Sequence, residues 1–197
     1  MRKRLITFVI VASAGAAVAS ITLAARNSPS AGRSAFSRLS NAQRDPVTLP
    51  VADVRTSRLR GSGFTQVWRI ATHGNTNFLE FDTTTGRHCY GTGQPRAAWP
   101  IDVVMCGDRA PFFPSLERPI LDLSVATFEK GDSVVHFTKV DGFAADGITR
   151  VVLLNAHGVT IGQVPVTGNT YSASTLPVEP VTAIAALDSA GNVVPRH

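Results

Sequence analysis

The stretch that most constrains how this chain can fold runs from residue 140 to residue 166. Ile148–Leu154 is rich in β-branched and aliphatic residues, which favour strands, and residues 155–158 have the Asn-Ala-His-Gly composition of a hairpin loop. Residues 159–166 form the predicted return strand, and their apolar positions shift phase around Gly162, which predicts a β-bulge. The stretch therefore predicts an antiparallel hairpin within a mainly β fold.

Further short strands are predicted on both sides of this hairpin. In residues 116–197, apolar runs near residues 120–128, 133–141, 170–174 and 181–187 are separated by turns that contain Gly, Asn or Asp. Several short strands at this spacing, without a long helix, are typical of a β-sandwich. Residues 116–197 are therefore predicted to form one sandwich module.

Two motifs in this module resemble known groups of proteins. Residues 186–193 match the A-x-D-x-x-G-N pattern that closing hairpins of bacterial immunoglobulin-like modules often carry. Residues 142–166 are similar to a group of uncharacterised exported actinobacterial proteins, which share a D-G-[IV]-x-R-V strand start, an upstream Cys pair and an N-terminal apolar segment. The resemblance implies an immunoglobulin-like sandwich and carries over no active site. Both cysteines lie outside the sandwich half, which departs from the immunoglobulin pattern.

Residues 61–115 are predicted to form a smaller antiparallel sheet. Residues 64–71 and 77–82 are the expected hairpin strands, and residues 101–106 are an apolar run suited to a buried strand. Trp99, Phe112 and Phe113 lie in loops bounded by prolines. These aromatic residues either cap the sheet, which is the favoured interpretation, or bind a partner.

The chain has two cysteines, Cys89 and Cys106, which are predicted to form a disulfide across this small sheet. An even cysteine pair in an exported chain is most often a disulfide. The alternative is a catalytic thiol activated by His88. That pairing is geometrically poor, because adjacent strand residues point to opposite faces.

The N-terminus carries an export or membrane-anchoring pattern. Three basic residues at positions 2–4 precede residues 5–25, a stretch of 21 residues without a charge. As a helix it would span about 31 Å, close to the roughly 30 Å of a bilayer core. The alternative is a signal peptide cleaved near Ala19, where Ala17 and Ala19 fit the A-x-A pattern. Both interpretations place the rest of the chain outside the cytoplasm.

The positive charge of the chain lies mainly outside the predicted folded modules. Residues 26–60, predicted as a linker, hold seven arginines against Asp45 and Asp53, a net charge of +5. Residues 61–197 hold nine basic and twelve acidic residues, a net charge of −3. A nucleic-acid-binding domain carries its basic excess on the folded part, so nucleic acid is not an expected partner. Residues 51–60 either form a short helix or lie as a basic linker over anionic headgroups.

Sequence motifs for catalysis or cofactor binding are absent. The chain has no GxSxG, HExxH, P-loop or zinc-type spacing, and its five histidines are scattered. No cofactor and no metal is expected. Asp132, Asp141 and Asp146 could converge on a calcium ion, but an Asp in an Asp-Gly turn more often bonds its own backbone.

Three functional hypotheses follow from the sequence. The first is a non-catalytic extracytoplasmic module, held in the cell membrane as a single-pass protein by residues 5–25, which binds or senses an envelope protein or glycan. The second is a secreted hydrolase whose Ser, His and Asp residues come together in space. The third is a structural envelope protein whose linker binds anionic surfaces.

Overall fold

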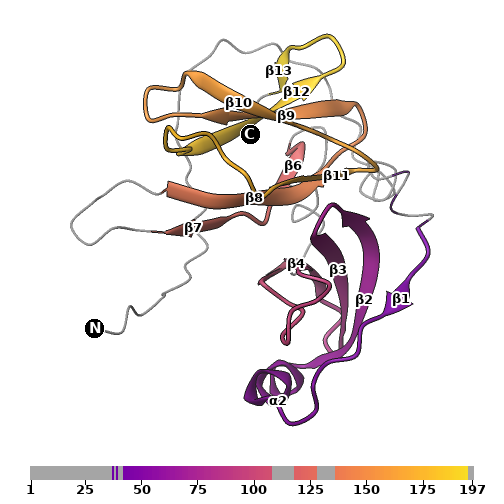
Figure 1. Cartoon of the computed structure of the whole chain (residues 1–197). Coiled ribbons are helices and arrows are strands. Elements are labelled where there is room, and N and C mark those ends of the chain that lie inside the picture. The colour runs from indigo at the N-terminus through magenta and orange to yellow at the C-terminus, as the bar shows by residue number, and fades with distance from the viewer. Residues whose placement is uncertain (1–36, 38, 40–41, 108–117, 128–135, 195–197) are drawn as a thin grey trace, which may run out of the picture.

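The computed structural model describes residues 37, 39, 42–107, 118–127 and 136–194, and within these ranges it is mainly β (Figure 1). Its strands form three antiparallel sheets, and the described residues contain one short helix. The predicted mainly β class and the disulfide-containing antiparallel sheet are confirmed. Residues 5–25 lie outside the described residues. Within the described ranges, no helix has the length and apolar character needed to span a membrane.

The first sheet comes from the N-terminal part of the described chain. Its strands are ordered β1-β2-β3-β4-β5. They are β1 (Asp45–Pro46), β2 (Phe64–His73), β3 (Thr76–Thr83), β4 (His88–Gly93) and β5 (Val103–Gly107). Short turns join β2, β3 and β4. In the β2–β3 turn Gly74 adopts a φ of 59°, a left-handed conformation that glycine reaches at little cost.

A short helix, α2 (Val54–Gly61), covers the outer face of the first sheet. The Asp53 carboxylate caps its N-terminus by accepting the backbone N–H of Arg55 at 2.8 Å. Thr56 and Leu59 point inward: Thr56 is buried, and Leu59 packs on the apolar cluster beneath the helix. The helix predicted over residues 51–60 is thus present. Both β1 and α2 fall in the segment predicted as a basic linker.

The rest of the described chain forms two further sheets. The middle sheet has the order β11-β8-β6, with β7 also paired to β8, and the third sheet has the order β10-β9-β12-β13. The middle sheet contains β6 (Ile120–Asp122), β7 (Val125–Thr127), β8 (His136–Ala144) and β11 (Thr170–Ala173). The third sheet contains β9 (Ile148–Leu154), β10 (Thr160–Pro165), β12 (Ala183–Asp188) and β13 (Val193–Val194).

The predicted hairpin of residues 148–166 is confirmed as β9 and β10. The two strands are antiparallel neighbours, and their register shifts between Thr160 and Gly162, where the bulge was expected. Gly158 closes the loop with a φ of 72°. Leu153 is buried in the cluster between the middle and third sheets. The local pattern of strand, loop and bulge in this stretch is therefore sufficient to specify its structure.

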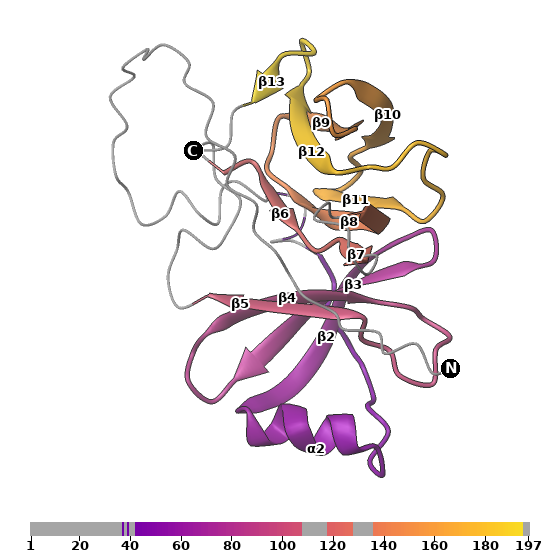
Figure 2. The same cartoon turned by 90° about the vertical axis from the view of Figure 1, so that its left-hand side faces the viewer.

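The three sheets are stacked as layers, with the middle sheet covered on both faces (Figure 2). One apolar cluster joins the middle sheet to the third sheet and includes Val140, Val151 and Tyr171. A second cluster joins the middle sheet to the first sheet and includes Phe78, Leu121 and Phe143. The first sheet and the C-terminal sheets thus share a hydrophobic core. The predicted boundary at residues 115 and 116 lies outside the described residues.

Strand β8 passes through the centre of this arrangement. Its last five residues, 140–144, are all buried, because alternate side chains enter the two clusters. Val140 faces the third sheet, and Phe143 faces the first. Between them, Gly142 lies so close to the Leu121 carbonyl and the Tyr171 ring that a Cβ atom would clash with both. A larger residue at position 142 would therefore separate the strands that form the middle sheet.

Candidate functional site

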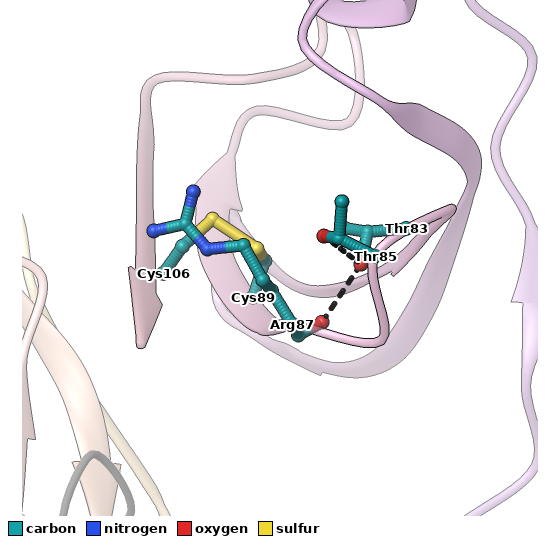
Figure 3. Close-up of a disulfide and its surroundings, with 5 residues drawn as sticks. All are labelled: Thr83, Thr85, Arg87, Cys89 and Cys106. Atoms are coloured by element: carbon teal, nitrogen blue, oxygen red, sulfur yellow. Dashed lines mark hydrogen bonds between the residues drawn. A yellow bond between two sulfur atoms is a disulfide. The ribbon is translucent and has the colours of Figure 1, made fainter. Parts of the chain in front are cut away.

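The disulfide links two neighbouring strands of the first sheet. Cys89 on β4 lies directly opposite Cys106 on β5, with 4.1 Å between their Cα atoms (Figure 3). The predicted pairing is confirmed. Because both sulfur atoms are in this bond, no thiol remains for the alternative of a catalytic cysteine. The nearby β3–β4 turn is held by a hydrogen bond from the Thr83 hydroxyl to the Arg87 carbonyl.

We expect the disulfide to contribute about 3 kcal/mol to the free energy of unfolding, because it closes a loop with a sequence separation of 17 residues. Denaturant melts of the Cys89→Ser/Cys106→Ser double variant measure this loss. Wild-type protein treated with a reductant is the control and should show the same loss. Two titratable thiols in unreduced, denatured wild-type protein would contradict the assignment.

A polar cluster lies between the first and middle sheets: Thr76 and Asp141 are buried, Lys139 and Ser172 are partly buried, and Asp102 lies at the exposed edge. At its centre the Asp141 side chain is fully buried. The Ser172 hydroxyl donates to Oδ1 of Asp141 at 2.7 Å and lies 2.9 Å from the Thr76 hydroxyl. The Lys139 Nζ lies 2.7 Å from Oδ2 of Asp141. The cluster thus connects strand β3 of the first sheet to β8 and β11 of the middle sheet.

Lys139 bridges two carboxylates. Its Nζ also lies 3.5 Å from Oδ2 of Asp102, which precedes β5 in the first sheet. Burial raises the pKa of Asp141 above its ordinary value, whereas the Lys139 ammonium and the Ser172 hydroxyl act in the opposite direction. The cost of removing the carboxylate from water thus outweighs the attraction of its partners. The cluster holds the first sheet on the middle sheet and places the Asp141 carboxyl group, which can bind a proton, in the interior.

The raised pKa of Asp141 predicts how stability depends on pH. The folded state binds this proton more tightly than the unfolded state, whose pKa is near 3.8. Wild-type protein should therefore gain stability relative to Asp141→Asn as pH falls through the raised pKa, and the gain should level off below about 3.8. Denaturant melts of both proteins from neutral to acidic pH measure this difference. A gain with rising pH would show that Lys139 outweighs burial.

Three of the described serines have their hydroxyls bonded within the fold. The hydroxyls of Ser62, Ser124 and Ser172 bond to backbone or carboxylate oxygens, and none of these three bonds to an imidazole. The described histidine side chains come from separate elements: His73 ends β2, His136 begins β8, and His157 lies exposed in the β9–β10 loop. The Ser172–Asp141 pair therefore lacks the base that would activate a serine.

The aspartates considered for calcium do not converge in the described part of the chain. Asp141 is paired with Lys139 in the interior. Asp146 accepts hydrogen bonds from the Ser37 N–H and the Asn169 amide. Asp132 lies outside the described residues. Among the described residues, no group of three or more His, Cys, Asp or Glu side chains is placed to hold a metal ion.

Two hollows in the surface of the described residues were considered as ligand sites. The larger, of about 380 Å³, lies beside β1 and β2, where the Arg69 guanidinium is paired with the Asp45 carboxylate at 2.6 Å. The smaller, of about 130 Å³, lies near the start of β9 and the end of β12. Ligand sites are usually apolar pockets of several hundred Å³ with a few convergent polar groups. The larger hollow is mainly polar and the smaller one is below this size, so neither matches such a site.

Comparison of the chain with protein-family models, with curated proteins and with solved structures gives no match.

Proposed function

We propose that this protein is a non-catalytic module of the cell envelope, tethered to the membrane by residues 5–25 and otherwise extracytoplasmic. The module would bind or sense an envelope protein or glycan. Its C-terminal part is proposed to be an immunoglobulin-like sandwich. This proposal is supported by the two facing antiparallel sheets around one apolar cluster and by the A-x-D-x-x-G-N run of residues 186–192.

The single observation that carries this proposal is the disulfide between Cys89 and Cys106. Disulfides form and persist outside the reducing cytoplasm, in secreted chains and at cell surfaces. Here the bond lies in a chain whose residues 5–25 are apolar and follow three basic residues. Oxidised cysteines and an N-terminal apolar segment support the same compartment independently.

The non-catalytic part of the proposal is supported by the inter-sheet polar cluster. Ser172 and Lys139 both bond to the buried Asp141 carboxylate, and they also reach the first sheet through the contacts of Ser172 with Thr76 and of Lys139 with Asp102. A catalytic group must instead reach substrate in a cleft. Stable sheets with exposed loops suit a binding scaffold, in which loops such as residues 155–158 contact the partner.

Fractionation of cells that express the full chain with a C-terminal tag tests the tether. The tagged protein should stay in the membrane pellet after extraction at alkaline pH, and added protease should digest it from outside the membrane. Intact mass should include residues 1–25. A mature mass that begins after Ala19, with the protein in the medium, would instead establish cleavage and secretion. Protein found with reduced cysteines in the cytosol would overturn the proposal.

A further inference from the structure

Helix α2 presents an exposed face to the solvent. Thr56 and Leu59 point toward the first sheet, and on a helix of 3.6 residues per turn the opposite side carries Val54 and Arg58. Val54 is 61% exposed, and Val51 just before the helix is 77% exposed. These are two of the few large apolar residues that the described surface exposes. One exposed apolar residue, Val54, thus lies on the outward side of the helix, and a second, Val51, lies just before the helix.

The charge on this helix is positive and largely uncompensated. Arg58 and Arg60 lie in its last turn, both are exposed, and neither forms an ion pair with a described residue. Arg55 is held differently, because it is paired with the Asp53 carboxylate at 2.6 Å and stacks over the Trp99 ring at 4.5 Å. Arg55 and Trp99 therefore fix the helix on the sheet, whereas Arg58 and Arg60 remain available to an anion.

The position of α2 also suits a surface contact. Both views place the helix at the far end of the molecule from the third sheet, with the first sheet between them (Figures 1 and 2). Residues 26–53 connect it to the proposed tether. A tether of this kind keeps the helix at high local concentration near the bilayer, so weak attractions become effective.

We infer that α2 is a membrane-facing surface, on which Arg58 on the outward side and Arg60 on the flank of the helix bind anionic lipid headgroups while Val51 and Val54 enter the headgroup region. This inference rests on the proposed tether. It commits to the lipid surface because exposed Val54 lies beside exposed Arg58, and this pairing matches both parts of a bilayer interface, its negative charge and its apolar interior. The helix would then orient the sheets, and the loops at their far end, away from the membrane.

Hydrogen exchange of the full chain in vesicles tests the inference. Vesicles of phosphatidylcholine alone are compared with vesicles that also contain phosphatidylglycerol. The backbone amides of α2 should be protected in the anionic vesicles and less so in the neutral ones, and added salt should remove the difference. Each arginine is expected to contribute about fivefold, so Arg58→Gln/Arg60→Gln should reduce the protection about 30-fold. Arg150→Gln, on the third sheet, is the control and should leave it unchanged.

The outcomes separate this inference from the proposed tether. Release of the protein from neutral vesicles at high salt would refute the tether, whatever happens at α2. Retention in both kinds of vesicle, with equal exchange at α2, would overturn the lipid surface and leave the tether intact. Equal protection of α2 by a soluble polyanion without vesicles would also overturn it, because the site would then recognise charge alone. Protection that requires phosphatidylglycerol and both arginines would establish it.

Discussion

Replacing Asp141 with alanine is expected to lower the free energy of unfolding by about 3 kcal/mol. The substitution leaves the Ser172 hydroxyl without its carboxylate acceptor and leaves Lys139, whose side chain is 15% exposed, with the longer contact to Asp102. A partly buried ammonium without its close counter-ion is costly, because the interior solvates it poorly. Urea melts followed by circular dichroism measure the loss.

The matched control is Asp102→Ala, which removes the other carboxylate from the same lysine. Asp102 is more exposed than Asp141, and its oxygen lies 3.5 Å from the Lys139 Nζ against 2.7 Å for Asp141. Its loss should therefore cost about 1 kcal/mol or less, as for a surface ion pair. If both variants lose the same free energy of unfolding, burial and hydrogen bonding do not make Asp141 more important than Asp102. The cluster would then act as a surface ion pair.

Local patterns predicted much of the fold. The β9–β10 hairpin, its bulge at Gly162 and the loop closed by Gly158 follow from short-range composition and strand periodicity, and the structure confirms them. The disulfide followed from the number of cysteines and the export pattern. These features depend on neighbouring residues or on a pair with no competing partner. For this reason a single sequence was sufficient to specify them.

The inter-sheet polar cluster could not be predicted in the same way. Asp141 was noted only as one of three aspartates, because its partners Thr76 and Ser172 lie 65 and 31 residues away in the chain. One indication was present in the sequence. Lys139, Asp141 and Phe143 are every second residue of β8, so their side chains point to the same face of the strand. A large aromatic residue on a face that also carries charges indicates that another layer of the fold covers that face. Strand periodicity did not show that the layer on this face of β8 is the first sheet.

The largest effect on packing is expected at that same interface. Phe143→Ala should lower the free energy of unfolding by about 4 kcal/mol, because the side chain is 2% exposed and its removal leaves a cavity between the sheets. The ring makes edge contacts with Phe78 and Tyr90 of the first sheet, with centroids 5.2 and 5.5 Å away. Val178→Ala, at a fully exposed position, is the control and should change stability by less than about 0.5 kcal/mol.

The same variant tests whether the first sheet and the C-terminal sheets unfold together. Both tryptophans, Trp68 and Trp99, belong to the first-sheet part, so their fluorescence reports that part, whereas circular dichroism reports every strand. Because Phe143 joins the two parts in one apolar cluster, both probes should give the same midpoint in wild-type protein, and Phe143→Ala should lower both midpoints equally. If fluorescence is unchanged in Phe143→Ala while circular dichroism shifts, the two parts fold independently and the shared cluster contributes little to either.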